Sequence, residues 1–332
     1  MTDSLSLAIP CRADEPGLAA TLESLYGACR HPQLPPQFMR ELVICINGVK
    51  QEESCVPLTA VRDFGVRHGV PVEELWIEGD CSPLPLGEGK NEPVSTELPS
   101  PSFTVLLTER KGKPPAWNTL WRWANGELVL FCDADVRVEK DAVYHLYAKL
   151  QQEPHLCLVA AREVPVLQAE GAWWGRLGAL PYRFNFGNAG GRLYLMRKDA
   201  LPGGMPEDLL LEDAWLTVAV GRCRVMKEPH AQVFFLPPAT WRDYFAERVR
   251  TEGGKLQLQR EHQSLLANGP VAQYNWSWFW QGIAFREYPL VVCSLALRLL
   301  ARLCARIAVA RKDFYALYRP FPSTKAWMPT RR

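Results

Sequence analysis

Signatures of several common enzyme classes are absent from the 332-residue sequence. It contains no Cys-x-x-Cys pair, and its six histidines show no zinc-type spacing, so we expect no zinc site. The runs Gly-x-x-x-x-Gly-Lys-Ser/Thr and Gly-x-Gly-x-x-Gly are missing too, which weakens ATPase and dinucleotide-enzyme interpretations. Without Gly-x-Ser-x-Gly, the sequence offers no nucleophile elbow for a hydrolase triad.

An excess of charge of one sign is absent as well. The 38 basic and 36 acidic residues leave a net charge of +2, so we expect no nucleic-acid partner. The ten cysteines are scattered without paired spacing, which favours a reducing compartment. The first residues show no basic segment followed by a long apolar one, so we expect no signal peptide. These absences together predict a cytoplasmic protein.

What the sequence does contain is an alternation of apolar strands and helices. Strands are predicted at 5–9, 41–46, 103–107 and 128–131, helices at 18–28 and 115–124, and a helix followed by a strand within 57–78. Continuous apolar strands between helices indicate an α/β fold with a mainly parallel sheet covered on both faces. Residues 79–102 are rich in proline and glycine without any period, and we expect a passive surface loop there rather than a lid.

Two aspartates follow one of these strands at the sheet edge where ligands of such folds bind. Asp133 and Asp135 come directly after the apolar run 127–132, with one small residue between them. Two carboxylates in this arrangement can hold one hard divalent cation. Taken alone, however, the pair is more often a polar turn that caps a strand, so its meaning depends on neighbouring motifs.

Those motifs occur in a recognisable order: 9–15 (Ile-Pro-Cys-Arg-Ala-Asp-Glu), Asn47-Gly48, Gly112-Lys113 with Asn118, then Asp133-Ala-Asp135. This order resembles the inverting family 2 glycosyltransferases of the GT-A fold. The segment 190–197 is similar to the acceptor-side strand of that family, and Glu212-Asp213 stands where the family has its Glu-Asp motif. The resemblance covers roughly residues 5–260 and rests on the order and spacing of several weak motifs.

The resemblance implies a role for each acidic residue. Asp135, with Asp133 beside it, would position Mn²⁺ or Mg²⁺ on the diphosphate of a nucleotide sugar. Asp213 would act as general base toward the acceptor hydroxyl, and Glu212 would orient the acceptor or the base. The ordinary alternative for Glu212 and Asp213 is that acidic residues stabilise a helix start through its dipole.

The resemblance also implies the binding residues for the donor and the acceptor. The donor set is Pro10, Arg12, Asp14, Asn47, Lys113, Asn118, Asp133, Arg248 and Arg250. The acceptor set is Gly190, Gly191, Trp173 and Trp174, although the two tryptophans could instead fill a core.

The chain departs from the family pattern at several of these positions. Arg12 and Ala13 replace an aromatic residue and an asparagine of the family pattern, and the base that the resemblance most often implies is uridine. Where many members have Gln-x-x-Arg-Trp, this chain reads Glu247-Arg-Val-Arg250-Thr251. The arginine could steady the departing diphosphate. The missing tryptophan argues against a processive polymer channel.

The C-terminal part has a different character. Aromatic residues cluster at 274–280, and a later apolar segment carries Arg298, Arg302 and Arg306 at every fourth position. This pattern is typical of a helix lying on a membrane surface rather than crossing it. A helix packed on the catalytic domain, or a dimer seam, explains it equally well. We therefore predict a catalytic domain at 1–265 and a helical tail at 266–332, with residues 274–311 as the segment that would touch a membrane.

The sequence thus predicts a cytoplasmic, metal-dependent, inverting glycosyltransferase of the hexosyltransferase class with a GT-A fold. If the C-terminal helix lies on lipid rather than on the domain, the protein is peripheral at the inner face of the membrane. Its acceptor would be a sugar or a lipid-linked molecule. The alternative from another class is a catalytically inactive homologue that binds nucleotide sugars and serves as a partner module. A nucleotidyltransferase is disfavoured, because it should carry Gly-x-Gly-x-Arg in the first loop, where this chain has Pro10-Cys-Arg-Ala-Asp14.

Overall fold

The structure is a computed structural model of the 332-residue chain. It describes residues 4–50, 54–77, 101–168, 172–183, 189–201, 203–263, 284–310 and 324. The aromatic cluster at 274–280 and all but the last two residues of the predicted insertion at 79–102 lie outside the described residues. Of those two, Ser102 begins a strand.

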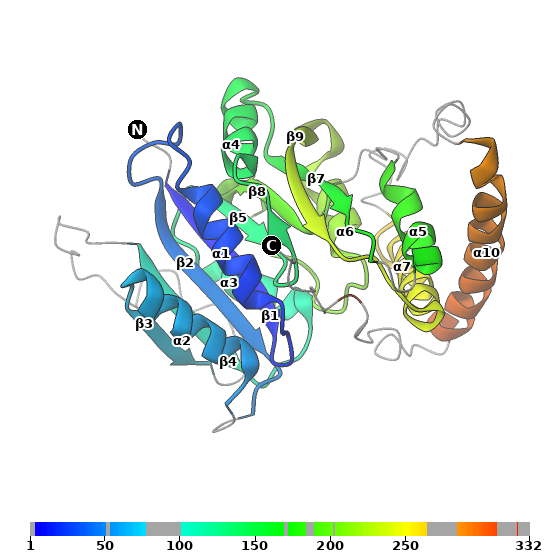
Figure 1. Cartoon of the computed structure of the whole chain (residues 1–332), viewed down its shortest axis with the longest axis horizontal. Coiled ribbons are helices and arrows are strands. Elements are labelled where there is room, and N and C mark those ends of the chain that lie inside the picture. The colour runs from blue at the N-terminus through cyan, green and yellow to red at the C-terminus, as the bar shows by residue number, and fades with distance from the viewer. Residues whose placement is uncertain are drawn as a thin grey trace.

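The N-terminal half of the sheet is built from five parallel strands (Figure 1). They are β1 (Leu5–Arg12), β2 (Met39–Asn47), β3 (Val72–Trp76), β4 (Ser102–Thr108) and β5 (Leu128–Cys132). Every strand expected from the apolar runs is present, and β1 and β2 extend beyond their predicted ends. Because parallel strands end at one edge of the sheet, the residues after β1, β2, β4 and β5 come together there.

Four further strands complete a nine-stranded sheet in the order β3-β4-β2-β1-β5-β8-β7-β9-β6. They are β6 (Arg137–Val138), β7 (Leu158–Pro165), β8 (Leu193–Arg197) and β9 (Val225–Phe235). Strand β8 lies antiparallel between β5 and β7, whereas β7 and β9 are parallel to each other. The predicted sheet, mainly parallel, is therefore confirmed, with an antiparallel strand placed directly beside the two aspartates.

Helices cover both faces of the sheet, as the continuous apolar strands predict. One face packs against α1 (Leu18–Cys29), α2 (Val56–His68) and α4 (Ala142–Gln152), and the other against α3 (Lys113–Trp123) and α6 (Glu212–Val220). Alternate residues of each strand point to opposite faces of the sheet and pack in the two hydrophobic cores that lie there. In β5, for example, Leu130 packs on the first side, and Phe131 stacks on Trp117 of α3 on the other.

Helix α3 begins two residues before its predicted start. Pro114 and Pro115 occupy its first turn, where a missing N–H costs no hydrogen bond, and Gly112 precedes the helix with a φ of 120°. This early start places Lys113 at the first helical position, at the carboxyl edge of the sheet.

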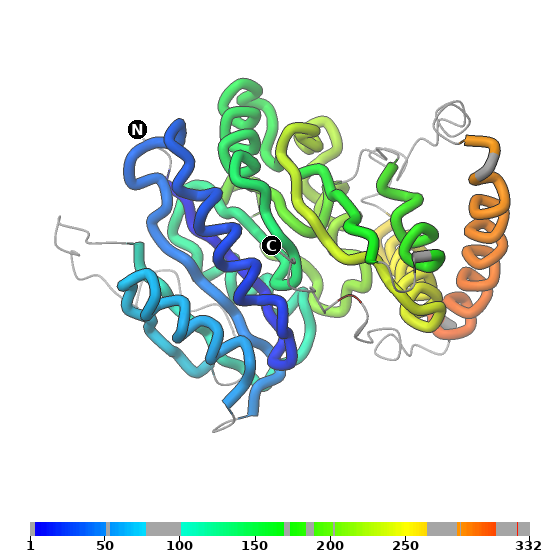
Figure 2. Tube along the Cα trace, viewed as in Figure 1, coloured from blue at the N-terminus to red at the C-terminus, as the bar shows by residue number. Residues whose placement is uncertain are grey.

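A helical layer stands at one end of the molecule (Figure 2). It consists of α5 (Ala172–Ala179), α7 (Trp241–Glu261) and α10 (Tyr288–Ala310), with α10 packed along α7. Tyr244 of α7, Leu177 of α5 and Leu290 of α10 share a small apolar core. Among the described residues, no helix is both long and apolar enough to span a bilayer. The boundary near residue 265 stays a prediction.

Candidate active site

A large cavity of about 1430 Å³ opens at the carboxyl edge of the sheet. Its walls come from the loops after β1, β2, β4 and β5, from the start of α6, and from α7 and α10. Twelve of the residues expected from the sequence line it: Pro10, Arg12, Asp14, Asn47, Lys113, Asp133, Asp135, Gly191, Glu212, Asp213, Arg248 and Arg250. Residues from seven separate segments of the chain thus meet in one place.

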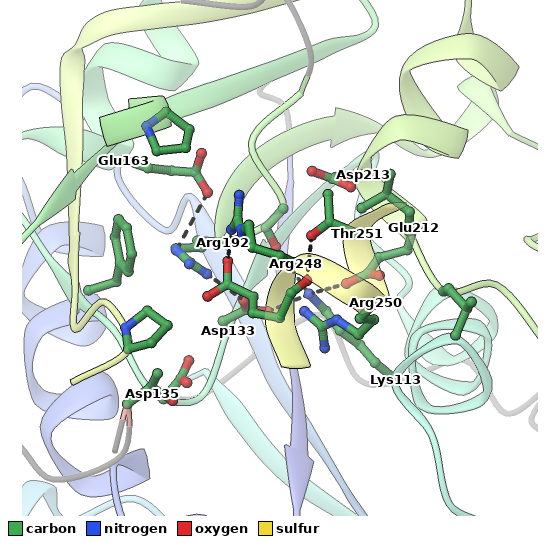
Figure 3. Close-up of a pocket in the computed structure, with 18 of the residues that line it drawn as sticks. Lys113, Asp133, Asp135, Glu163, Arg192, Glu212, Asp213, Arg248, Arg250 and Thr251 are labelled. Carbon is green, nitrogen blue, oxygen red and sulfur yellow. Dashed lines mark hydrogen bonds and ion pairs between the residues drawn. The ribbon is translucent and has the colours of Figure 1, made fainter. Parts of the chain in front are cut away.

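Lys113 lies at the centre of this group (Figure 3). Its Nζ is 2.7 Å from Asp133 Oδ1 and 2.7 Å from Glu212 Oε1, and it donates to the carbonyl of Gly191 at 3.3 Å. Burial alone would lower the pKa of Lys113, but the two carboxylates raise it well above its usual value. The amine is therefore charged and joins the loop after β5 to the start of α6.

Asp213 and Glu212 are the first two residues of α6, and their environments differ. Burial of Asp213, together with the nearby charges of Glu212 and Glu163, raises its pKa to about 6. Burial also acts on Glu212, but Lys113 and Arg250 hold the pKa of that carboxyl below its usual value. Asp213 Oδ1 accepts the backbone N–H of Ala214 at 2.8 Å, which fixes the carboxylate. Adjacent carboxylates whose pKa values are pushed apart suit different chemical tasks.

A second charged cluster lies on the β7 and β9 side of the cavity. Arg192 Nε is 3.5 Å from Glu163 Oε1, and Lys227 Nζ is 3.5 Å from Glu163 Oε2. Arg192 also stacks on the ring of Phe235, with its guanidinium carbon 3.8 Å from the ring centroid, and donates to the Tyr182 hydroxyl at 3.2 Å. Its other end reaches to 4.0 Å from Asp133 Oδ2.

These four residues, Glu163, Tyr182, Arg192 and Lys227, were not predicted as site residues. Two signals were available. Glu163 stands near the carboxyl end of a strand, and Arg192 follows Gly190-Gly191 directly. Apolar runs alone could not show that β7 and β9 pair in parallel and carry these charges to the same edge.

The two aspartates after β5 differ in their surroundings. Asp133 is engaged by Lys113, and burial raises its pKa. Asp135 lines the cavity beside Gly17, where an added Cβ would lie 3.1 Å from the Asp135 Cα. Within the part of the chain that the structure describes, no group of three or more His, Cys, Asp or Glu side chains could hold a metal ion. Asp133 and Asp135 both line the cavity, and two carboxylates are what a cation of the Mg²⁺ type takes from a protein when phosphate oxygens and water complete its shell.

The loops after β1 and β2 form another wall of the cavity. Arg12 and Asp14 form a two-pronged ion pair, with Nε to Oδ1 at 2.9 Å and the second nitrogen to Oδ2 at 2.7 Å. Asn47 is the last residue of β2 and is buried, and its carbonyl accepts the N–H of Ala13. Gly48 follows with a φ of 77°, which makes the sharp exit from the strand accessible.

The two arginines of α7 are not equivalent. Arg248 is buried, forms an ion pair with its neighbour Glu247, and lies over the ring of Tyr244. Arg250 is partly exposed to the cavity, and its charge lowers the pKa of Glu212. Arg250 is thus the arginine that faces the acidic pair, while Arg248 is held within the helical layer.

Four predicted residues do not line the cavity. Asn118 is buried on α3, and its side-chain amide forms two hydrogen bonds with the backbone of Met205. Asn118 Nδ2 donates to the Met205 carbonyl oxygen at 2.8 Å, and the Met205 N–H donates to Asn118 Oδ1 at 2.9 Å. Trp173 on α5 is 47% exposed, and Trp174 packs against the small core around Tyr244. Gly190 lies behind the wall, where an added Cβ would be 3.0 Å from the carboxyl carbon of Glu163. Asn118 and Trp174 are therefore in the positions of packing residues. The polar group of Asn118 and the apolar ring of Trp174 are already in contact with other groups of the protein.

Comparison with known families gives this geometry its context. Residues 94–205 match the family model described as glycosyl transferase family 2. This segment of the chain is therefore similar to glycosyl transferase family 2. It contains Lys113, Asp133 and Asp135, and it ends before Glu212.

Two individual proteins extend the comparison. The chain is 26% identical over 181 residues to poly-β-1,6-N-acetyl-D-glucosamine synthase of Staphylococcus aureus, covering 49% of this chain and 43% of that protein. It therefore spans less than half the length of the curated relatives it matches. The mannosyltransferase PcManGT from Pyrobaculum calidifontis, solved in complex with GDP-Man and Mn²⁺, has a TM-score of 0.53 and 18% identity, covering 97% of this chain and 83% of that chain. This likeness shows the GT-A fold.

Proposed function

We propose that the protein is an inverting glycosyltransferase that moves a sugar from a nucleotide diphosphate sugar to an acceptor hydroxyl. The observation that supports the proposal is the pairing of Lys113 with both Asp133 and Glu212, because all three side chains line one cavity. Asp213, next to Glu212, has its pKa raised to about 6, which suits a general base at neutral pH.

The reaction follows from the charges that develop during the transfer. The oxygen of the acceptor hydroxyl attacks the anomeric carbon while Asp213 accepts the proton of that hydroxyl. The bond from the anomeric carbon to the diphosphate breaks on the opposite side, so the configuration at this carbon is inverted. Negative charge then appears on the leaving diphosphate. Arg250 and Lys113, both cationic and both lining the cavity, stabilise it electrostatically. Glu212 holds Lys113 in place.

A divalent cation fits the same site through Asp135, with Asp133 beside it. When bound, Mn²⁺ or Mg²⁺ supplies Lewis-acid stabilisation of the diphosphate oxygens. The complex of PcManGT, which contains Mn²⁺ and GDP-Man, supports a metal-dependent nucleotide-sugar donor. For the base we propose uridine, as the family resemblance implies, with Asn47 and Asp14 near it, and guanosine is the alternative that PcManGT provides.

The departures in the α7 motif bear on the product. The curated relatives from Staphylococcus aureus are named as synthases of a polymer, whereas this chain has Thr251 where many processive members have tryptophan. We therefore propose a single-transfer enzyme whose acceptor is a sugar or a lipid-linked molecule.

The test is a thermal-shift screen of uridine and guanosine diphosphate sugars, each with and without Mn²⁺. A ligand that binds only the folded state raises the unfolding temperature, so a donor should stabilise the protein when the metal is present. Asp135→Asn should remove the metal-dependent part of the shift, while the exposed matched control Asp63→Asn should keep it. If no donor stabilises the wild-type chain under either condition, the proposed function is wrong. Donor stabilisation without transfer to any acceptor would favour the inactive homologue.

A further inference from the structure

The exposed side of α10, called its outer face, is apolar along its whole length. The exposed side chains on this outer face are Val292, Leu295, Leu299, Leu300, Leu303 and Ile307, and all but Leu300 recur every three or four residues. Leu299 is 66% exposed, and Leu303 and Ile307 are each 56% exposed. Phe285, just before the helix, is 85% exposed. An exposed apolar patch of this extent marks an interaction surface.

The opposite side of the helix is already occupied. Ala301, Ala305 and Val309 are buried, and Ser294 lies 3.4 Å from the hydroxyl of Tyr244 on α7. Figure 1 shows α10 at the outer edge of the molecule, with α7 and α5 between it and the sheet. The apolar outer face is therefore not needed for the packing of the helix onto the protein.

The charges of α10 are all of one sign. It carries Arg298, Arg302 and Arg306 and contains no acidic residue. The three arginines follow one another at intervals of four residues and so form a row along one edge of the outer face. Arg298 and Arg302 also line the cavity, whereas Arg306 does not. An apolar face bordered by cations matches the acyl chains and phosphates of an anionic lipid surface.

We propose that α10 docks on an anionic lipid surface, with its outer face at the acyl boundary and Arg302 and Arg306 at the lipid phosphates. The absence of a spanning helix among the described residues agrees with a helix lying in the interface plane. Charge complementarity favours lipid over a second copy of this chain, because two copies meeting through α10 would bring six arginines together without an acidic partner from that helix.

Docking in this orientation has a consequence for the cavity. Leu295, Leu299 and the first two arginines belong to both the outer helix and the cavity wall. A lipid surface docked on α10 therefore lies beside this wall of the cavity, and, resting on the proposed function, a lipid-linked acceptor enters the cavity past this wall. The docking itself does not depend on that function.

The experiment is flotation of the full chain with vesicles of phosphatidylcholine alone or mixed equally with phosphatidylglycerol, at low and high salt. The wild type should float with the mixed vesicles and be released by salt. The double variant Leu303→Glu/Ile307→Glu lies outside the cavity and should lower the partition coefficient by about tenfold or more, because it places two charges at the acyl boundary. Arg306→Ala should weaken binding to the mixed vesicles and leave the weaker binding to neutral vesicles unchanged.

The matched control is Val66→Glu, which charges an apolar residue that is 83% exposed on α2, far from α10 (Figure 1). It should float as the wild type does. All variants should keep the nucleotide-sugar thermal shift of the wild type, so that a loss of docking is distinguished from a loss of fold or of donor binding. Equal flotation of wild type and double variant would overturn the proposal. So would a wild-type dimer in light scattering that the double variant converts to a monomer, with no vesicle binding.

Discussion

Lys113 Nζ lies 2.7 Å from Glu212 Oε1, so the first residue of α3 is tied to the first residue of α6. The same amine is 2.7 Å from Asp133 at the end of β5. One cation thus balances two carboxylates that would otherwise repel each other at the centre of the cavity. This balance governs both the stability of the site and its affinity for anions.

Replacement of Lys113 by methionine should lower the free energy of unfolding by about 1–3 kcal/mol, since it leaves two partly buried carboxylates without their shared cation. It should also weaken binding of a nucleoside diphosphate, which loses a positive partner. Both effects are measurable by urea unfolding and by calorimetric titration. The exposed Lys140→Met serves as the control and should change neither quantity. A Lys113 variant as stable as the control would show that the pairing contributes nothing.

Replacement of Asp213 by asparagine removes the proposed base and keeps the shape of the side chain. Transfer should fall by about 10²–10⁴-fold, while binding of the nucleotide sugar is kept. Steady-state transfer and thermal shift measure the two properties separately, with Asp63→Asn as the matched control. Unchanged transfer in the Asp213 variant would exclude this residue as the base.

The raised pKa of Asp213 also predicts a pH dependence. Only the ionised carboxylate accepts a proton, so kcat/KM should rise as the pH increases through about 6 and level off above it. The free energy of unfolding changes with pH in the opposite direction. Because burial raises the native pKa, the native state holds its proton more tightly than the unfolded chain, and the stability gained at low pH is lost as the pH rises through about 6. Asp213→Asn should therefore unfold at a higher temperature than the wild type at pH 8, and a lower temperature would contradict the raised pKa.

Asn118 provides a test of a residue that the structure removes from the cavity. Asn118→Ala should cost about 2–3 kcal/mol of stability, because both of its hydrogen bonds to the Met205 backbone are buried. The affinity for the nucleotide sugar, measured on the folded variant below its unfolding temperature, should not change. A large loss of affinity without loss of stability would return Asn118 to the donor site.

The two arginines of α7 should respond differently to alanine. Arg248→Ala leaves the charge of Glu247 uncompensated within the helical layer and should cost about 3 kcal/mol of stability. Arg250→Ala should instead weaken diphosphate binding by roughly 10–100-fold with a smaller effect on stability, since it removes a charge-assisted contact. Unfolding curves and diphosphate titrations of the two variants, compared directly, decide between these roles, and identical behaviour would contradict the distinction.

The strands and helices of the N-terminal half could be predicted because their signals are local. An apolar run such as that of β5 is buried on both faces, and the prolines at the start of α3 mark a helix wherever it packs. The strand-end rule then placed Asp133 and Asp135 at one edge of the sheet, and both line the cavity.

Other parts of the site could not be predicted, because they depend on long-range pairing. Glu163 and Lys227 reach the cavity through the parallel pairing of β7 with β9, which no local pattern encodes. Asn118 has the chemistry of a ligand-binding residue, yet the chain that passes beside it at Met205 satisfies its amide. The sequence shows the row of arginines on α10. Only the structure shows that two of them also line the cavity.

The sequence by itself determined the order of strands and helices, the positions of the acidic motifs after strand ends, and the family to which they point, since each depends on residues close together in the chain. Only the tertiary structure decided the network of charges. Coulomb interactions and desolvation depend on distance in space, so the state of Asp213 and the partners of Lys113 appear only when α3, β5 and α6 meet.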